Sequence, residues 1–335
     1  MPARIALDAM GGDHAPSETV AGAVDAARRG VDVLLVGARD LLEEELAGYD
    51  IDLAVADAPD VIGMADDPAR ALREKPSASI AVCARLVASG DAAGFVSAGS
   101  TGAAMAAAAI IIGRIPGVAR PAIATIIPTS GTPTLLLDSG ANPEVKAEQL
   151  AQFAVMGSVA ARAMLGADPP RVGLLSIGEE KGKGRSLERS AYELIEASSV
   201  EFVGNIEGRD VATDKVDVIV TDGFTGNVFL KATEGTASLM NSYVDEALST
   251  LSDDIRSAVL PVLAQVRERM DWETYGGAQL LGIRGSALIA HGSSTRRAIA
   301  NALVMARDSA DRNLPGRIAR ALGDSGEIDP PDLQP

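Results

Sequence analysis

The strongest constraint on the fold of this chain is a repeated order of short apolar strand, glycine-containing turn and helix. A strand predicted at 4–7 runs into Gly11-Gly12, and Ser17–Arg29 then spaces its apolar residues as a helix does. Further strands are predicted at 33–36, 94–98, 134–137, 172–176, 216–220 and 287–290. Strands that alternate with helices in this way usually pair in parallel, because each helix carries the chain back across the sheet. We therefore predict an α/β fold in three layers, α/β/α, with a largely parallel sheet.

The length and composition suit one large α/β body. Of the 335 residues, 47% are hydrophobic, and no Ser- or Gly-rich linker divides the chain. We predict a single domain over 1–325 and a polar tail over 326–335, since the chain turns polar and proline-rich after Leu314. A helical excursion is predicted at 236–272, where strand signals are lacking and Pro261 is expected to break the second of two helices.

Charge and cysteine content exclude several classes of protein. The chain has 46 acidic and 30 basic side chains, whereas nucleic-acid binders cluster Lys and Arg against phosphates. Adsorption to an anionic membrane by charge alone is disfavoured for the same reason. The single cysteine, Cys83, excludes an internal disulfide framework and a Cys-rich zinc site. The longest apolar run, 103–112, falls well short of the roughly 20 residues that span a bilayer, and the first residues lack a signal-peptide pattern. We expect a cytoplasmic enzyme.

Two glycine motifs at predicted strand ends could bind an anion. Asp8–Pro16 contains Gly11, Gly12, Asp13 and His14, and Ser97–Ala103 contains Ser100 and Thr101 at the start of an Ala-rich helix. Glycines let backbone N–H groups turn toward an anion, and a helix N-terminus adds its positive end. The alternatives are a tight turn in which Asp13 caps the next helix, and Ser/Thr capping of the Ala-rich helix.

Four further motifs carry polar or charged groups in similar turns. Leu137–Pro143 contains Asp138 and Asn142, which could orient a ligand or form an ordinary Asx turn. Gly178–Gly184 places Lys183 between glycines, where its ammonium could meet an anionic substrate or oxyanion, or stay solvated. The last two, Thr221–Val228 and His291–Ser294, contain Asp222, Gly223 and Asn227, and His291 and Ser293.

The turns are expected to converge on one site, because ligands of parallel sheets bind beyond the carboxyl ends of the strands. Both histidines of the chain, His14 and His291, lie in such turns. No Gly-x-Ser-x-Gly elbow, zinc spacing, P-loop or Gly-x-Gly-x-x-Gly pattern is found, and Cys83 has no histidine near it in sequence. We predict an anion-binding enzyme with no covalent nucleophile, no metal and no cofactor.

These motifs in this order resemble the PlsX-type bacterial phosphate acyltransferases. The resemblance covers nearly the whole chain and is most specific at Thr221–Asn227 and Tyr275–Ser294. It implies transfer of a fatty acyl group from acyl carrier protein to inorganic phosphate, giving acyl phosphate for phospholipid (phosphatidic acid) synthesis. It also implies a fold like that of isocitrate and isopropylmalate dehydrogenases, and a homodimer.

Roles for the site residues are assigned from their chemistry. The catalytic candidates are Lys183, His14, His291 and Asn227, with Lys183 the first choice for neutralising phosphate or a tetrahedral oxyanion. The candidates for binding substrate or phosphate are Gly11, Gly12, Asp13, Ser100, Thr101, Asp138, Asn142, Asp222, Gly223 and Ser293. Asp138 and Asp222 are expected to orient other groups, because free carboxylates would repel phosphate.

The helical excursion is a candidate membrane contact. Val259, Leu260 and Leu263 belong to an apolar cluster around Pro261, and a helix-tip patch of this kind could lie in the membrane interface. Burial of the same residues in a homodimer is the alternative, and both hold if the stems pair and the tip protrudes. This predicts peripheral membrane association, with a membrane glycerol-3-phosphate acyltransferase as a further partner. The rival functions are a dehydrogenase of the same fold and a non-enzymatic organiser that docks acyl carrier protein.

Overall fold

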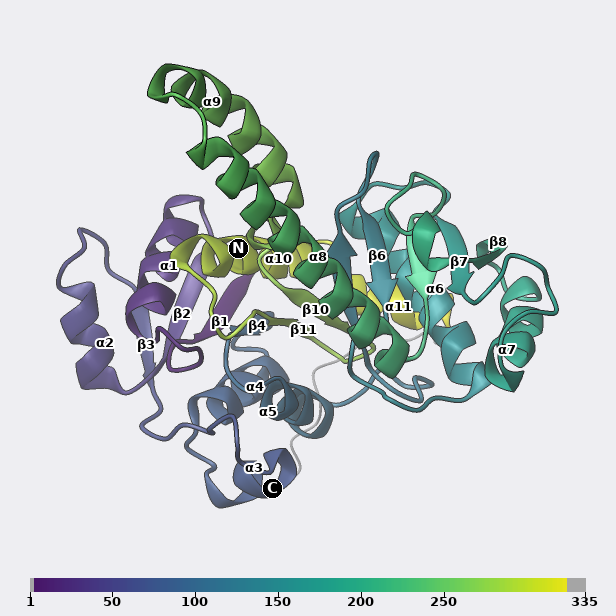
Figure 1. Cartoon of the computed structure of the whole chain (residues 1–335). Coiled ribbons are helices and arrows are strands. Elements are labelled where there is room, and N and C mark those ends of the chain that lie inside the picture. Colours follow the sequence, from purple (N-terminus) through teal and green to yellow (C-terminus); the bar gives the residue numbers. More distant parts are fainter. Residues whose placement is uncertain (1–2, 324–335) are drawn as a thin grey trace.

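The computed structural model describes residues 3–323 and contains one sheet of eleven strands, in the order β3-β2-β1-β4-β11-β10-β5-β6-β9-β7-β8 (Figure 1). The strands are β1 Arg4–Asp8, β2 Asp32–Gly37, β3 Ala54–Asp57, β4 Gly94–Ser97, β5 Ala122–Ile127, β6 Thr134–Leu137, β7 Arg171–Leu175, β8 Glu201–Ile206, β9 Val218–Val220, β10 Ala278–Leu281 and β11 Ser286–Ile289. Each predicted strand is present within two residues of its expected bounds. Strands β3, β5, β8 and β10 are additional.

The helices follow the alternation that the sequence predicted. They are α1 Ser17–Arg28, α2 Arg39–Leu46, α3 Pro68–Glu74, α4 Ser79–Ser89, α5 Thr101–Ala107, α6 Ala147–Met164, α7 Ser186–Glu196, α8 Gly223–Ser249, α9 Asp253–Met270, α10 Arg296–Asp311 and α11 Leu314–Ala321. The Ala-rich helix α5 continues as a π-helical turn, Ala108–Ile112, and short 3₁₀ turns occur at Gly208–Asp210 and Trp272–Thr274.

Helices cover both faces of the sheet, which confirms the three-layer α/β/α prediction. Ala6 of β1 faces the core under α4 and α5, whereas its neighbours Ile5 and Leu7 face α1 and α10. In β6, Leu136 packs with Phe229 of α8, and the residues on either side of it face α6. Helices α4, α5 and α8 therefore share one face, and α1, α10, α6, α7 and α11 share the other.

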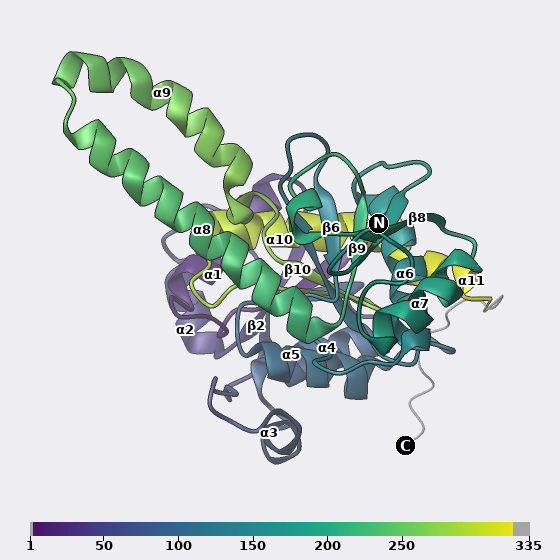
Figure 2. The ribbon, with the colours of Figure 1, turned by 45° about the vertical axis from the view of Figure 1, so that its right-hand side comes forward.

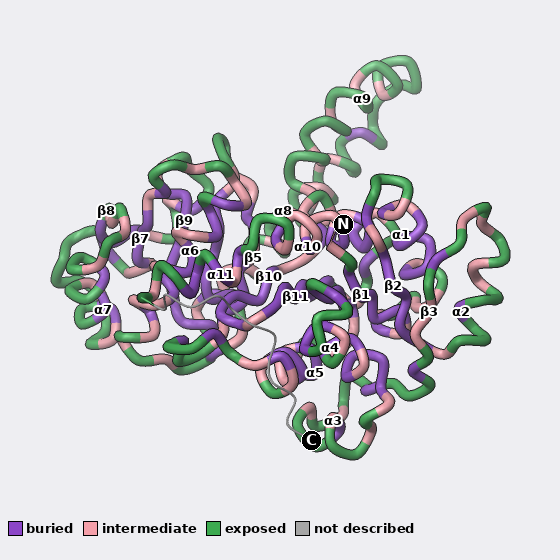
Figure 3. Tube along the Cα trace, turned by 180° about the vertical axis from the view of Figure 1, so that it is seen from behind, coloured by how far each residue is buried: buried purple, intermediate pink, exposed green. Residues whose placement is uncertain are grey.

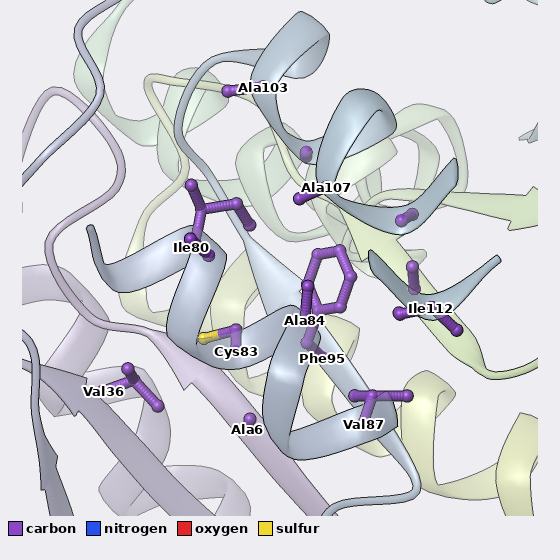
Figure 4. Packing of buried hydrophobic residues seen from close by; sticks show 14 of the residues in the cluster. Ala6, Val36, Ile80, Cys83, Ala84, Val87, Phe95, Ala103, Ala107 and Ile112 are labelled. Atoms are coloured by element: carbon purple, nitrogen blue, oxygen red, sulfur yellow. The ribbon is translucent and has the colours of Figure 1, made fainter. Parts of the chain in front are cut away.

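Small residues let the helices lie close to the sheet in this core. Figure 4 shows Phe95 of β4 surrounded by Ala84, Ala107 and Ile112, with Cys83 nearby on α4. Phe95 and Cys83 are fully buried. The core is thus filled by many alanines around a few large side chains, which agrees with a chain that is only 3% aromatic.

The strands run in opposite directions in the two halves of the sheet. Strands β3, β2, β1, β4 and β11 are parallel to one another, and so are β6, β9, β7 and β8. Between the halves, β10 pairs antiparallel with β11 and β5, and β5 pairs antiparallel with β6. The prediction of a largely parallel sheet is confirmed. The carboxyl ends of the two halves point in opposite directions, and the convergence of the glycine turns on one site stays a prediction.

The strand register nevertheless places the carboxyl ends of both halves next to the same row of paired residues. A single row of paired residues crosses the sheet through Leu7, Val96, Leu288, Gln279, Ala124, Leu137, Val220 and Leu174. Asp8 and Ser97 lie one residue beyond this row on one side, and Asp138 and Thr221 lie one residue beyond it on the other. The turns therefore form two groups that flank β10 and β5.

Helices α8 and α9 form a long hairpin that projects from the body (Figure 2). The hairpin begins at Gly223, earlier than the predicted 236, and its outer part is largely exposed (Figure 3). Pro261 lies inside α9 and does not break it, so that prediction is wrong. The helix is exposed there, and water can hydrogen-bond the Ser257 carbonyl that loses its N–H partner.

The residues predicted as a helix tip, Val259, Leu260 and Leu263, lie in the middle of α9. The end of the hairpin is formed by residues 250–252, where Leu251 is exposed, and Ile255 follows on the first turn of α9. The tip assignment is therefore corrected to this turn. Within residues 3–323, no helix has the length and apolar character needed to cross a membrane.

The chain after Leu314 is more ordered than the sequence indicated. Helix α11 buries Leu314 and Ile318 against α6, because the segment has apolar residues at helical spacing beneath its polar ones. The predicted tail, 326–335, lies outside the described residues, and the single-domain boundary at 325 stays a prediction.

Candidate active site

The first group of turns lies at the carboxyl ends of β1, β4 and β11, and we call it the first cluster. The hydroxyl of Ser97 donates to Asp8 Oδ2 at 2.6 Å, and the Gly99 N–H donates to Ser97 Oγ at 3.1 Å. A Cβ on Gly11 would lie 2.7 Å from both Asp8 Oδ2 and Gly99 N, so only glycine allows the two loops to approach this closely. Buried Asp8 thus holds two predicted anion-binding loops together.

Both histidines belong to this cluster. The Asp13 N–H donates to the Gly292 carbonyl at 2.7 Å, which joins the His14 turn to the His291 turn. His291 Nδ1 lies 2.8 Å from Ser293 Oγ, and His14 and His291 are both exposed. Asp13 does not cap α1, whose N-cap position is Pro16. The capping role weighed for Ser100 is confirmed, because its hydroxyl accepts from the Ala103 N–H at 3.4 Å.

Asp8 was not among the predicted site residues, although it ends a strand just before paired glycines. Burial raises the pKa of Asp8, and hydrogen bonds from Ser97 and from backbone N–H groups only partly offset this. Its Oδ1 atom is buried without a hydrogen-bond partner in the structure. A carboxyl in this environment favours its neutral form more than an exposed aspartate does.

The second group of turns lies at the carboxyl ends of β6, β9 and β7, and we call it the second cluster. Asp138 accepts hydrogen bonds of 2.8–3.1 Å from four backbone N–H groups and from the Asn142 amide. The same amide donates to the Pro121 carbonyl at 2.7 Å. Burial raises the pKa of Asp138, while these donors oppose the shift. Asp138 and Asn142 therefore use their hydrogen-bonding groups to shape the loop, and their binding of substrate stays a prediction.

Asp222 begins α8. Its carboxylate accepts from the Thr225 N–H at 2.8 Å, from the Thr225 hydroxyl at 2.9 Å and from Arg185 at 2.6 Å. Burial opposes the ionisation of Asp222, but these donors outweigh it, so the pKa of the carboxyl is lowered. The residue is an ionised helix cap with its charge already paired.

Asn227 stands on the exposed side of the first turns of α8, next to the loop that follows β6. The helix approaches this loop so closely that a Cβ on Gly226 would lie 1.9 Å from the Asp138 carbonyl oxygen. A Cβ on Gly140 would lie 3.5 Å from Asn227 Oδ1. Gly226 thus allows the contact that brings the exposed Asn227 amide beside Gly140.

Lys183 lies in the loop between β7 and α7. Its side chain is 51% exposed, and its ammonium is 4.0 Å from the Glu180 carboxylate, which is 73% exposed. An ion pair this long and this exposed contributes little, so the ammonium can turn toward an anion. Arg185 and Glu188, two residues that the sequence analysis missed, anchor the end of this loop. The spacing Arg-Ser-Leu-Glu at a helix start was the available signal, since Glu at this position commonly closes a capping box.

The structure divides the predicted site residues between the two clusters. Gly11, Gly12, Asp13, His14, Ser100, Thr101, His291 and Ser293 lie in or next to the first, and Asp138, Asn142, Lys183, Asp222, Gly223 and Asn227 in the second. Strands β10 and β5 separate them, and the hydroxyls of Thr125 and Ser139 meet at 2.7 Å beside β5. Within residues 3–323, no group of three or more His, Cys, Asp and Glu side chains is placed to hold a metal ion.

The α/β/α fold of this chain is shared with enzymes of known structure. EutD phosphotransacetylase from Staphylococcus aureus aligns with a TM-score of 0.60 at 18% identity, covering 92% of this chain and 94% of that one. A 4-hydroxythreonine-4-phosphate dehydrogenase from Klebsiella pneumoniae aligns at 0.53 and 13%, covering 92% and 100%. These likenesses confirm the predicted dehydrogenase-like fold.

Sequence comparison identifies the family within this fold. The family model described as fatty acid synthesis protein matches residues 3–317. A phosphate acyltransferase from Desulforamulus reducens is 46% identical over 323 residues, covering 95% of this chain and 97% of that protein. The chain belongs to this family, the PlsX-type phosphate acyltransferases, and is an acyltransferase, as the motifs indicated.

Proposed function

We propose that this chain transfers a fatty acyl group from acyl carrier protein to inorganic phosphate and so supplies acyl phosphate for phospholipid synthesis. The observation that carries the proposal is the arrangement of polar groups in the second cluster. It presents an exposed ammonium and an exposed amide at neighbouring strand ends, while its buried carboxylates are already hydrogen-bonded. Phosphate can enter such a site without meeting an unpaired buried negative charge.

The chemistry requires little from the protein beyond positioning and charge stabilisation. A phosphate oxygen attacks the thioester carbonyl carbon, a C–O bond forms, and negative charge develops on the carbonyl oxygen. The C–S bond then breaks, and the thiolate leaves and takes up a proton from water. Phosphate is already a competent nucleophile, so alignment of the two substrates supplies much of the acceleration. Lys183 is assigned to neutralising phosphate or the oxyanion, and Asn227 to positioning.

An acyl-enzyme on the single cysteine is unfavourable. Burial, with a smaller effect from nearby Asp8, raises the pKa of the Cys83 thiol well above its ordinary value, and the side chain is fully buried among apolar residues (Figure 4). A thiol in this environment is a poor nucleophile. Direct attack by phosphate needs no such intermediate.

The first cluster is assigned a supporting role in substrate binding. His14 and His291 are exposed donors beside Gly12, and strands β10 and β5 lie between them and Lys183. His291 follows β11 and Lys183 follows β7, and neighbouring strands are about 4.8 Å apart, so the two strand ends are separated by about 24 Å across the sheet. A histidine here would contact another part of the substrates rather than the atom that Lys183 neutralises.

The function is tested by mixing a long-chain acyl carrier protein thioester with phosphate and following acyl phosphate and free thiol. We expect both products in equal amounts, without added NAD or magnesium. A requirement for NAD would favour a dehydrogenase, and carrier binding without turnover would favour a docking protein. Replacement of the carrier by a different thioester donor at equal efficiency would contradict the assignment of the carrier.

We also propose a homodimer that attaches peripherally to membranes. The stem of α8 exposes Leu239, Met240 and Tyr243, each more than half exposed, which suits pairing with a second copy. The outer hairpin exposes Leu251, Ile255 and Leu260 beyond the body of the molecule (Figure 2). A product with a charged, labile head and a long acyl chain is best released at a membrane that holds the next acyltransferase, such as one acting on glycerol 3-phosphate.

A further inference from the structure

Arg185 joins the loop that carries Lys183 to the helix that carries Asn227. Its guanidinium contacts Glu188 Oε1 at 2.5 Å and Asp222 Oδ2 at 2.6 Å, and its backbone N–H donates to Glu188 Oε2 at 2.6 Å. Glu188 is on the first turn of α7, and Asp222 caps α8. One side chain therefore fixes the starts of two helices that follow neighbouring strands.

The two carboxylates share this single guanidinium, which is the side-chain cation that both contact. The side chains of Glu188 and Asp222 are 9% and 4% exposed, and both bond to Arg185 Nη2, while Nε also bonds to Glu188. A planar guanidinium can bind two carboxylates at fixed angles, whereas an ammonium is a point charge on a flexible stem. The guanidinium also neutralises the negative charge of these carboxylates, which would otherwise repel a bound phosphate.

The positions of the two candidate catalytic groups follow from this link. Lys183 is separated from Arg185 only by Gly184, whose φ of +94° favours glycine, and Asn227 lies one helical turn beyond Asp222. Displacement of either helix start would change the distance between the ammonium and the amide. We propose that Arg185 is a positioning residue that holds Lys183 and Asn227 in one phosphate site, an inference that rests on the proposed function of that site.

Arg171 offers a matched control for the purely structural alternative. It binds Asp217 at 3.0 Å and Asp214 at 3.4 Å, and so links the segments that enter β7 and β9, at the ends of these strands away from the second cluster. Like Arg185, Arg171 is an arginine that contacts two carboxylates and connects segments next to β7 and β9. If Arg185 had only a structural role, its replacement and that of Arg171 should therefore change stability and activity in the same way.

The test compares Arg185→Gln, Arg185→Lys and Arg171→Gln for kcat, for KM of phosphate, for phosphate affinity by calorimetry and for the thermal unfolding midpoint. We expect Arg185→Gln to lower kcat/KM by about 10²-fold, the loss typical of a misplacement of about 1 Å. Arg185→Lys should keep the fold and lose part of this rate. Arg171→Gln should lower the unfolding midpoint and leave kcat/KM near the wild-type value.

A double-mutant cycle with Lys183→Ala identifies the route of the effect. If Arg185 acts by placing Lys183, Arg185→Gln should cost little further rate once the lysine is gone. A full multiplicative loss in the double variant, or equal rate losses for Arg185→Lys and Arg171→Gln, would overturn the proposal. If the wild type binds phosphate but makes no acyl phosphate, the proposed function fails. The positioning role is then tested by phosphate affinity alone, and it is rejected if both Arg185 variants bind phosphate as tightly as the wild type. If the wild type neither binds phosphate nor reacts, both fail.

Discussion

At the scale of single residues, the carboxylates near the site differ in what they contact. Asp222 is ionised and paired, so it stabilises the fold at neutral pH, a contribution lost as pH falls from the ordinary aspartate pKa toward the lowered one. Asp8 is buried with one oxygen unpartnered, and burial raises its pKa. The two residues occupy similar strand ends, and only their partners distinguish them.

Lys183→Ala is expected to lower the rate of acyl phosphate formation by about 10²–10³-fold, because removal of one contact to phosphate or oxyanion has that typical cost. The side chain is half exposed, so the circular dichroism spectrum and unfolding midpoint should not change. Lys181→Ala is the control, since that lysine lies in the same loop but pairs with Glu196 at 2.5 Å. A wild-type rate for Lys183→Ala would contradict the charge-neutralising role assigned to this lysine.

Asp8→Asn is expected to change the pH dependence of stability. A carboxyl with a raised pKa in the folded state holds its proton more tightly than in the unfolded chain, so its contribution to stability falls as pH rises from about 4 through the folded pKa. The asparagine variant lacks this loss. Urea unfolding at pH 4 and pH 7 should show the variant gaining stability relative to the wild type as pH rises, and parallel pH profiles would contradict the raised pKa.

At the scale of elements, the hairpin of α8 and α9 is the least buried part of the described chain (Figure 3). Of its residues, Gly223, Gly226 and Leu248 are buried. The base of α8 approaches β6 closely, whereas the outer hairpin has few contacts with the body to hold it. The candidate site and the projecting hairpin therefore share one continuous helix.

Replacement of Val259, Leu260 and Leu263 by Glu is expected to abolish flotation with anionic phospholipid vesicles while activity in solution and dimer mass persist. A second variant, Leu251→Glu with Ile255→Glu, places the charges at the corrected tip and should have at least as large an effect. Leu41→Glu on α2 is the control, because Leu41 is 47% exposed and lies on the body. Dissociation into monomers, or loss of activity in solution, would instead assign these residues to the dimer core.

Pro261→Ala is expected to strengthen α9. Proline inside a helix removes one N–H donor and typically costs about 3 kcal/mol. Hydrogen–deuterium exchange of the α9 amides should slow in the variant, and acyltransferase activity in solution should stay unchanged because the site lies at the base of α8. Unaltered exchange would mean that the helix already compensates for the proline.

At the scale of the whole molecule, two half-sheets of opposite direction meet at β10 and β5. Each half carries its own glycine turns, and the stagger of the sheet places both sets close to one row of residues. A substrate that spans the central strands would contact both halves. The candidate binding groups thus lie on both sides of β10 and β5.

The proposed dimer predicts that light scattering will give twice the mass of one chain. Leu239→Asp combined with Tyr243→Asp should reduce this to one chain, because burial of charge in an apolar interface is unfavourable. Phe224 and Val228, which are exposed nearer the body, serve as a matched control pair for substitution by Asp. A monomeric wild type, or a dimer that persists in the α8 double variant, would contradict the use of this face.

The sequence by itself determined the family, seven of the eleven described strands, and the glycine turns proposed to carry the chemistry. These are local properties, because hydrophobic periodicity, glycine turns and helix starts depend on neighbouring residues. Local reasoning failed at two places. The polar, proline-rich composition after Leu314 did not indicate helix α11, and Pro261 was expected to end a helix that continues because it is exposed to solvent.

Only the tertiary structure decided how the turns are grouped. The hydrogen bond between Ser97 and Asp8 joins residues 89 apart, and the Arg185–Asp222 contact joins residues 37 apart. The separation of the histidines from Lys183 depends on the antiparallel pairing of β10 and β5. Strand direction and long-range pairing are set by how the whole chain crosses the sheet, and no local pattern of residues specifies them.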